Sequence, residues 1–248
     1  MAGQAVTKAQ PRFQPAAPDT AFICNHLNVS RQSFSHLLNE VVTADKQPVA
    51  DVLNAQRGQQ IYGPKRPANG VFIINEGAIR LFRMMADGRR AIIRFLFPGD
   101  LLWVGSNDLQ AFEAEAVIDS HLSWFAGDII NKLMHEAPQI RAFLLDHITE
   151  DLRCLQNQLV TLGRKLAVER VAFFLTMLAA RQCQRGMPID PVLLPMSRSE
   201  IADFLGLTTE TVSRSFSQLK AMGNISAQDQ GAVHIHDVER LASLADGL

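Results

Sequence analysis

Hydrophobic residues follow two different patterns along the chain, and the first covers about residues 49–125. Glycines separate short apolar segments there, and Gly77, Gly88 and Gly99 fall at equal intervals of eleven residues. Three of these segments are rich in β-branched and aromatic residues: VFIIN (71–75), AIRLFRMM (78–85) and RAIIRFLF (90–97). Asp87 and Gly88 stand between the last two, where a tight hairpin turn needs residues that tolerate positive φ. The region is predicted to form an antiparallel sandwich or jelly-roll-like barrel.

The pattern becomes helical after Pro138. One apolar row then repeats at intervals of 3, 4, 3, 4 and 3 residues: Leu145, Ile148, Leu152, Leu155, Leu159 and Leu162. This is the a/d repeat of a coiled coil, and it predicts a long helix that pairs in parallel with the same helix of a second copy. The alternative is that the row packs only against its own β domain, as one face of any surface helix does. Gly163 interrupts the row, so we expect a hinge there and a second helix over residues 165–182.

A helix-turn-helix motif is predicted near the C-terminus. Ser197 and Glu200 have the S-x-x-E spacing of a capping box, in which each side chain bonds a free backbone N–H at the start of a helix. Gly206 stands where a sharp turn is needed, and Thr208 can cap the next helix through its hydroxyl. Two short helices with a glycine turn form a helix-turn-helix, and residues 224–236 have the pattern of a hairpin that would form its wing.

The second helix of this motif is expected to read DNA. Val212, Phe216 and Leu219 recur at i, i+4 and i+7 and form its inward face. The outward positions hold short polar or charged side chains: Thr209, Glu210, Ser213, Arg214 and Ser217. In the major groove an arginine can bond two acceptors of guanine, a glutamate can accept from cytosine, and a serine can bond either way. The alternative is a solvated helix face on which Glu210 and Arg214 form an ordinary i,i+4 ion pair.

Composition places the chain among folded, soluble proteins. Of its 248 residues 47% are hydrophobic and 20% are charged, which excludes wholesale disorder and collagen-like chains. The longest nearly uncharged apolar run, residues 171–180, is about half of the roughly 20 residues that a membrane-spanning helix needs. Residues 1–20 contain no apolar segment of signal-peptide type, so we expect a cytoplasmic protein without a membrane partner.

Charge does not by itself indicate a nucleic-acid partner, because 24 basic and 25 acidic residues leave a net charge of −1. DNA binding therefore has to depend on local geometry rather than on a basic surface as a whole. No recognisable catalytic motif is present, so an enzyme is not expected; catalytic groups far apart in sequence are the remote alternative.

The order of a β domain, a leucine-striped helix and a winged helix-turn-helix resembles the Crp–Fnr superfamily of bacterial transcription regulators, from about residue 28 onward. Residues 194–225, LPMSRSEIADFLGLTTETVSRSFSQLKAMGNI, are similar to the FixK and Fnr branch, whose recognition helix carries E-x-x-S-R. Glu210, Ser213 and Arg214 match that motif. We therefore expect an α+β fold in four parts: a flexible leader (1–27), an antiparallel, jelly-roll-like β-roll sensor domain (28–137), a dimerisation helix (138–163) and a winged helix-turn-helix DNA-binding domain (164–248).

The resemblance also implies a function. A homodimer would bind palindromic double-stranded DNA with TTGA-like half-sites, and RNA polymerase would be a further partner. The bases would be read by Glu210, Ser213 and Arg214, with Thr209 and Ser217 on the same face as further DNA contacts. Three other residues fall at positions that hold phosphates in the family: Ser197, Arg198 and Thr208.

No cofactor is expected. The cyclic-nucleotide branch of the family uses a glutamate for the ribose and an Arg-Ser pair for the phosphate, whereas this chain has Val104 and Gln110-Ala111 at those positions. A buried phosphate without a cation is costly, so cyclic AMP is not expected. The iron–sulfur cluster of the Fnr branch needs four cysteines, and this chain has three, Cys24, Cys154 and Cys183. The alternative is control by another small molecule or by haem in the β-roll.

Cys183 is a candidate redox switch. Arg181 and Arg185 flank it in sequence, and nearby cations lower the pKa of a thiol and make it more reactive. The alternative is an ordinary cysteine near a loop.

Overall fold

The computed structural model describes residues 50–63, 69–105, 112–228 and 231–247. The predicted leader (1–27), Cys24 and the pair Gln110 and Ala111 lie outside these ranges.

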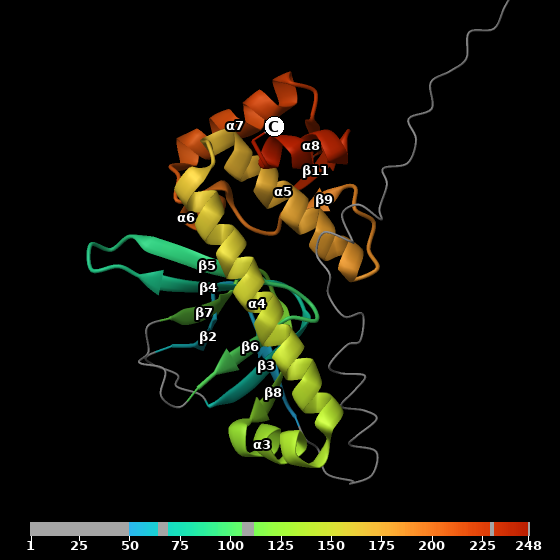
Figure 1. The fold of residues 1–248 in the computed structure, drawn as a ribbon. Helices are drawn as coiled ribbons and strands as arrows, with labels where there is room; N and C mark the ends of the chain where they lie inside the picture. Colours follow the sequence, from blue (N-terminus) through green and yellow to red (C-terminus); the bar gives the residue numbers. More distant parts are fainter. Residues whose placement is uncertain (1–49, 64–68, 106–111, 229–230, 248) are drawn as a thin grey trace, which may run out of the picture.

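The N-terminal domain consists of two antiparallel sheets that face each other (Figure 1). The first sheet has the order β1 (Asp51–Ala55), β8 (Ser120–Ala126), β3 (Gly70–Glu76) and β6 (Leu101–Val104). The second has the order β2 (Gln60–Tyr62), β7 (Glu113–Ala116), β4 (Ile79–Met84) and β5 (Arg90–Leu96). Ile74 and Leu122 of the first sheet pack with Ile61 and Ile79 of the second in one buried core. The antiparallel β-roll expected from the sequence is confirmed.

The three apolar segments become β3, β4 and β5, and a glycine follows each of them in a turn. Gly77, Gly88 and Gly99 all have positive φ, at 93°, 84° and 93°. Gly77 is restricted in two ways, because a Cβ there would also lie 2.1 Å from Ser120 Oγ. That hydroxyl accepts a hydrogen bond from the backbone N–H of Ala78, so it cannot move aside without a cost.

The rest of the chain is mainly helical. The helices are α3 (Gly127–Glu136), α4 (Pro138–Arg164), α5 (Ala167–Gln184), α6 (Arg198–Leu205), α7 (Thr209–Ala221) and α8 (Val238–Ala245). A small sheet has the order β10 (Ile225–Gln228), β11 (Ala232–Ile235) and β9 (Val192–Leu193). The predicted helix-turn-helix is formed by α6 and α7, and the predicted wing by β10 and β11. No helix in the described ranges is long and apolar enough to cross a membrane.

The hinge predicted at Gly163 is not where the chain breaks. Helix α4 continues through Gly163 to Arg164, and the backbone is extended at Lys165 and Leu166, with ψ values of 146° and 163°. The break falls at this position because Glu169 accepts a hydrogen bond from the N–H of Leu166, which caps the start of α5. Glycine is tolerated in the last turn of a helix, so Gly163 by itself does not end α4.

The β domain and the C-terminal domain share one continuous hydrophobic core. The ring of Phe95 on β5 lies 5.5 Å from that of Phe204 on α6 and 6.3 Å from that of Phe174 on α5. The rings of Phe174 and Phe204 are also 5.5 Å apart. These three phenylalanines fill the space between the two domains, so the helix-turn-helix packs directly on the second sheet.

Ion pairs surround this shared core. On β4, Arg80 pairs with Glu115 of β7 and with Glu200 of α6. On β5, Arg90 lies 2.9 Å from Asp203 of α6. Each of these carboxylates is at least partly buried, and a buried charge is stable only when it is paired. The contacts fix α6 relative to the β-roll at several points.

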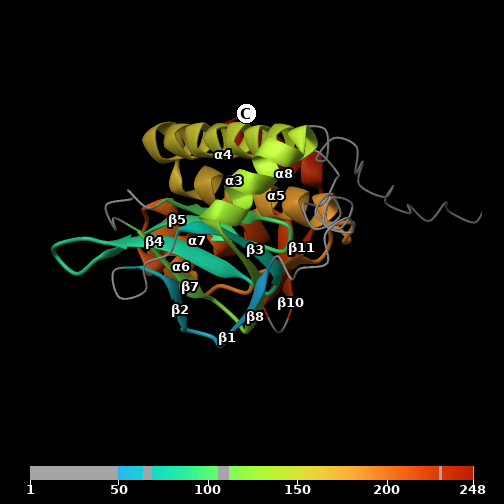
Figure 2. The same ribbon diagram turned by 90° about the horizontal axis from the view of Figure 1, so that it is seen from below.

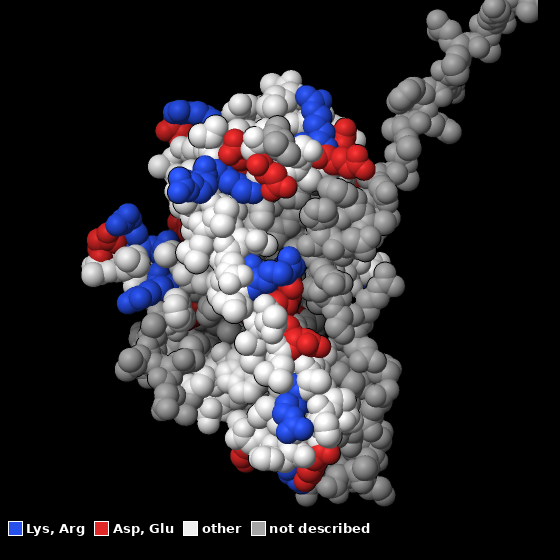
Figure 3. All heavy atoms as spheres, viewed as in Figure 1, with Lys and Arg blue, Asp and Glu red and all other residues white. Residues whose placement is uncertain are grey.

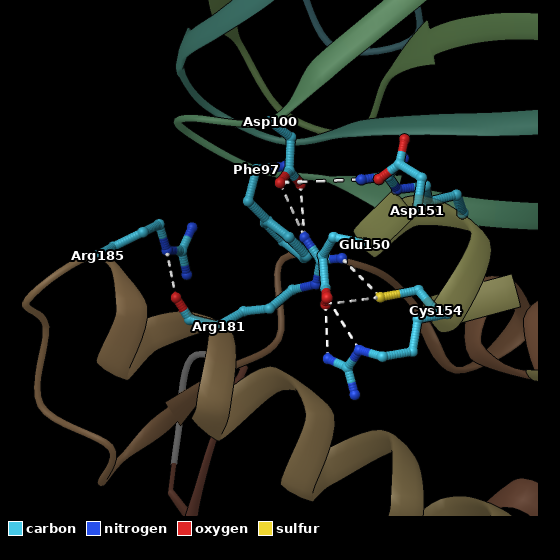
Figure 4. A network of polar contacts seen from close by, with 9 residues as sticks. Phe97, Asp100, Glu150, Asp151, Cys154, Arg181 and Arg185 are labelled. Atoms are coloured by element: carbon cyan, nitrogen blue, oxygen red, sulfur yellow. Dashed lines mark hydrogen bonds and ion pairs between the residues drawn. The ribbon is translucent and has the colours of Figure 1, made fainter. Parts of the chain in front are cut away.

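Further polar contacts join the β-roll to α4 and α5 (Figure 4). Arg181 of α5 bonds both carboxylate oxygens of Asp100 at 2.8 and 2.9 Å, and Arg94 of β5 pairs with Asp151 of α4. Burial alone would raise the pKa of Asp100, but Arg181 and Arg94 outweigh it and hold this pKa below its ordinary value. Asp100 is therefore ionised, and it links the end of the β-roll to α5.

Truncation of the shared core tests whether the two domains are stabilised together. We expect Phe204→Ala to lower the free energy of unfolding by about 3–5 kcal/mol, because it leaves a cavity between Phe95 and Phe174. Urea unfolding followed by circular dichroism measures the loss. Phe112→Ala is the matched control, since Phe112 is exposed and its truncation leaves no cavity. An equal loss in both variants would contradict the shared core.

Candidate nucleic-acid interface

The predicted capping box starts α6. Ser197 Oγ accepts from the N–H of Glu200 at 3.2 Å, and Glu200 Oε2 accepts from the N–H of Ser197 at 2.7 Å. Burial alone would raise the pKa of Glu200, but the bonds from Ser197 and the cation of Arg80 lower it below its ordinary value. The ionised Glu200 thus caps its own helix and binds the β-roll through Arg80 at the same time.

The turn between the two helices has the predicted chemistry. Gly206 ends α6 in the left-handed conformation, with φ of 62°, which a residue with a Cβ adopts only at a cost. Thr208 Oγ1 accepts from the N–H of Thr211 at 3.1 Å and caps α7. Val212, Phe216 and Leu219 are buried as expected. The packing of these side chains fixes which face of α7 is directed outward.

That outward face carries the predicted row of polar side chains, all of them exposed: Thr209, Glu210, Ser213, Arg214 and Ser217. Glu210 and Arg214 form an ion pair along the helix, and each side chain is 73% exposed. Ser213 Oγ donates to the carbonyl of Thr209 at 2.9 Å, and Ser217 Oγ donates to that of Ser213 at 3.1 Å. Both hydroxyls keep oxygen lone pairs directed away from the helix backbone, and an exposed ion pair of this kind rearranges at little cost.

The three residues expected at phosphates lie near the starts of the two helices. Ser197 and Thr208 are exposed, but their hydroxyls already cap α6 and α7. Arg198 is half-buried, and its guanidinium lies over the ring of Phe216 at 3.3 Å from the centroid. Burial lowers the pKa of Arg198, although guanidinium groups stay charged in proteins. Its Nη1 atom has no hydrogen-bond acceptor within the described residues.

The leucine stripe of α4 is uncovered over most of its length. Five of its six members are between 42% and 70% exposed: Leu145, Ile148, Leu152, Leu155 and Leu159. Leu162 is half-buried. The alternative that the stripe packs against its own β domain is therefore wrong. Figures 1 and 2 show α4 on the outside of the molecule, and Figure 3 shows a largely uncharged band along it.

The face of α4 next to the stripe is the one that contacts its own chain, and beyond the first two turns of the helix that face is polar. Ile140 and Leu144 are buried at the start of the helix. Farther along, the inward positions hold polar or weakly polar side chains at the same alternating intervals: His147, Asp151, Cys154, Gln158 and Thr161. A helix that directs leucines outward and polar side chains inward leaves an apolar stripe in water unless another surface covers it.

The environment of the cysteines differs from the prediction. Arg181 and Arg185 were expected to activate Cys183, but Arg181 binds Asp100 and Arg185 lies over the ring of Phe97. Cys183 instead packs at the edge of the shared core. The cysteine beside Arg181 is Cys154, whose Sγ lies 3.9 Å from Nη2 (Figure 4). The redox role of Cys183 stays a prediction, and these two arginines give it no support.

Cys154 is not an activated thiol. Burial raises its pKa, and the neighbouring carboxylate of Glu150 raises it further, whereas Arg181 only partly offsets the two. The thiol form is a poor nucleophile, because the thiolate is the reactive species. Cys154 therefore contributes to the packing of α4 on α5 rather than to chemistry.

The β-roll position that a cyclic nucleotide would need is apolar. Val104 is 1% exposed and packs among the apolar residues of the β-roll core, so it offers no acceptor to a ribose hydroxyl. The second position, Gln110 and Ala111, lies outside the described residues. At Val104, the residue present does not fit a cyclic nucleotide.

The side chains that connect α6 to the rest of the chain could not be identified from the sequence. Arg80 and Arg90 bind α6 from the β-roll, and Gln158 and Arg170 bind it from α4 and α5. No spacing pattern could have identified them, because their partners lie between 35 and 120 residues away and two of the acceptors are backbone carbonyls.

Two family models match the two halves of the chain. Residues 169–244 match the Crp-like helix-turn-helix domain, and residues 52–136 match the cyclic nucleotide-binding domain. The second match covers the β-roll.

Known proteins resemble the chain over most of its length. It is 31% identical to the nitrogen fixation regulation protein FixK of Bradyrhizobium diazoefficiens, over 91% of this chain and 90% of that protein. It is 32% identical to the transcriptional activator protein Anr of Pseudomonas aeruginosa, over 77% of this chain and 79% of that protein. The solved structure of FixK2 from Bradyrhizobium japonicum superposes with a TM-score of 0.70 at 34% identity, and the match covers 79% of this chain and 98% of that one.

These relatives are transcription regulators rather than enzymes, and they share both the β-roll and the helix-turn-helix with this chain. The chain therefore belongs to the Crp–Fnr family of transcription regulators and, within it, to the FixK-like branch.

Proposed function

We propose that the protein is a homodimeric transcription activator that binds a palindromic, TTGA-like site and needs neither cyclic AMP nor an iron–sulfur cluster. The observation that carries the proposal is the exposed row of Glu210, Ser213 and Arg214 on helix α7, whose other face is buried in the shared core. The activating role follows from relatives such as Anr, a transcriptional activator, and RNA polymerase is the partner that such a role requires.

The roles on α7 follow from the chemistry of base edges. Arg214 donates two bonds to a guanine, Glu210 accepts from the amino group of a cytosine, and Ser213 bonds either as donor or as acceptor. The ion pair of Glu210 and Arg214 holds both side chains extended along one face before DNA arrives. Because an exposed pair contributes only about 0–1 kcal/mol, bonds to bases replace it readily. Thr209 and Ser217 lie at the two ends of the same face.

Phosphate contacts come from the starts of the two helices. Helix N-termini bind anions through their free N–H groups, and Ser197 and Thr208 stand at those of α6 and α7. Arg198 adds a cation, and Phe216 restricts its motion. These contacts position the protein on DNA and carry no sequence information.

The dimer contact is the leucine stripe of α4. A second copy supplies a matching apolar stripe, and pairing the two removes five exposed leucine or isoleucine side chains per protomer from water. A parallel arrangement places both recognition helices on the same side, at successive major grooves about 34–36 Å apart.

The contacts between the domains support the proposed independence from an effector. A ligand changes activity by binding one arrangement of a protein better than another. Here the shared core and the pairs Arg80–Glu200, Arg90–Asp203 and Arg181–Asp100 connect the β-roll to the C-terminal domain through the chain's own residues. Together with the apolar Val104, these contacts support a relative position of the two domains that needs no ligand.

Charge on the leucine stripe tests the dimer. The double variant Leu152→Glu, Leu155→Glu should be a monomer that no longer binds the palindromic site, because two buried carboxylates per helix oppose association. Sedimentation velocity measures the mass, and a gel-shift titration measures the binding. Gln156→Glu, Asn157→Glu is the matched control, since it adds the same charge at exposed positions beside the stripe. An unchanged dimer in the leucine variant would overturn the assignment.

Two arginine variants separate positioning from base reading. Arg198→Ala should weaken binding to all sequences alike and lower the slope of log K against log salt by about one unit. Arg214→Ala should cost about 1–3 kcal/mol and relax the preference at one guanine. Titrations of half-site variants at several salt concentrations measure both effects. Uniform loss across all half-sites for both variants would remove the base-reading role from Arg214.

Effector independence is tested with purified protein in reducing buffer. Operator DNA should bind with a dissociation constant that cyclic AMP changes by less than about twofold, since no coupling free energy is expected. The absorption spectrum of the same sample should lack a Soret band and the charge-transfer bands of iron–sulfur centres. Binding that appears only after a small molecule is added, or a coloured protein, would contradict this part of the proposal.

A further inference from the structure

One arginine connects the end of α4 to the turn of the helix-turn-helix. Arg170, in the first turn of α5, donates three hydrogen bonds to three backbone carbonyls. Nη2 bonds Leu162 O at 2.9 Å, Nε bonds Lys165 O at 3.0 Å, and Nη1 bonds Leu205 O at 3.0 Å. The acceptors belong to the last turn of α4, to the connector that follows it and to the last residue of α6.

These carbonyls need a donor from a side chain. The N–H of Leu166, which would continue the helix to Leu162 O, donates to Glu169 instead. Leu205 ends α6, and the last carbonyls of a helix have no partner within it. Carbonyls at helix C-termini carry a partial negative charge, so a guanidinium between two such termini is favourable to both helices.

Helix α4 reaches the same turn with two of its own side chains. Gln158 Nε2 donates to the carbonyl of Phe204 at 3.0 Å. Leu162 packs on the turn itself, since a Cβ added at Gly206 would lie 3.5 Å from its Cδ2. Three successive residues, 204 to 206, are therefore in contact with α4 or with Arg170.

We propose that Arg170 and Gln158 are positioning residues that fix the recognition helix relative to the dimer axis, and that they thereby determine which spacing between half-sites the protein accepts. The inference rests on the proposed homodimer. Helix α4 supplies the dimer contact, α6 and α7 share one core, and α7 starts three residues after Gly206. A rotation at this turn would change the distance and the angle between the two recognition helices of the dimer.

The spacing preference is the measurement that tests this role. Wild-type protein and variants are titrated with a duplex that carries one half-site and with duplexes whose two half-sites are set at the preferred spacing or one or two base pairs longer or shorter. Wild type should prefer one spacing. Arg170→Met keeps the apolar stem and removes all donors. The ratio of the affinity at the preferred spacing to the affinity at other spacings should therefore fall about tenfold, which is the usual effect of losing hydrogen bonds from a charged donor. Binding to the single half-site should stay close to that of wild type.

Further variants separate positioning from folding. Arg170→Lys keeps the charge but replaces the planar fork with one ammonium, so it should restore part of the preference. Gln158→Ala removes one bond and should lower the preference by a smaller factor, whereas Gln156→Ala, exposed on the same helix, should leave it unchanged. Gln158→Ala also provides the test if Arg170→Met does not fold.

The outcomes are distinguishable. An intact preference in Arg170→Met and Gln158→Ala, or an equal loss on the single half-site and on all spacings, would overturn the positioning role. A wild-type protein that is monomeric, or that binds all spacings alike, would instead contradict the proposed homodimer on a palindromic site.

Discussion

The structure depends on which side chains of α4 contact the rest of the chain and which point to water. Its inward face is held by polar contacts, such as Arg94 with Asp151 and Gln158 with the carbonyl of Phe204, while its leucines point to water. The polar contacts are specific in geometry, so they fix the rotation of the helix about its own axis. That rotation decides that the leucine stripe faces outward, where it is available to a second copy.

Helix α6 joins the parts of the molecule, although it is only eight residues long. Its first turn is bound to the β-roll through Glu200, its last turn through Asp203 and Phe204, and its C-terminal carbonyls to α4 and α5. Because the recognition helix follows directly, these contacts determine where α7 lies. Through α6, the recognition helix thus has a fixed position relative to both the β-roll and α4.

The β-roll has the fold of a cyclic nucleotide-binding domain, but its residues make other contacts. Val104 packs with apolar neighbours where the cyclic-nucleotide branch has a polar residue, and Asp100 is used for a contact with Arg181 of α5. Charged groups of this domain thus bind the helices of the same chain. These contacts agree with the proposed independence from a ligand.

Local features of the structure could be predicted from the sequence because each has a periodic or short-range cause. Glycines at eleven-residue intervals predicted the turns of the β-roll, the S-x-x-E spacing predicted the start of α6, and the a/d repeat predicted a long helix where α4 lies. The outward face of α7 followed from the spacing of Val212, Phe216 and Leu219. In each case the residues that interact lie within a few positions of one another.

What the sequence could not determine involves partners far apart in the chain. Arg181 was expected beside Cys183, but its long side chain reaches Asp100, 81 residues away. The expected break at Gly163 moved to Lys165 and Leu166 because Glu169 caps the next helix there. Arg170 had no signature at all, since its acceptors are backbone carbonyls, which every residue carries. The sequence alone thus determined the elements and the exposed chemistry of α7, whereas only the tertiary structure decided how α4, α6 and the β-roll are connected, because long polar side chains choose their partners by proximity in space.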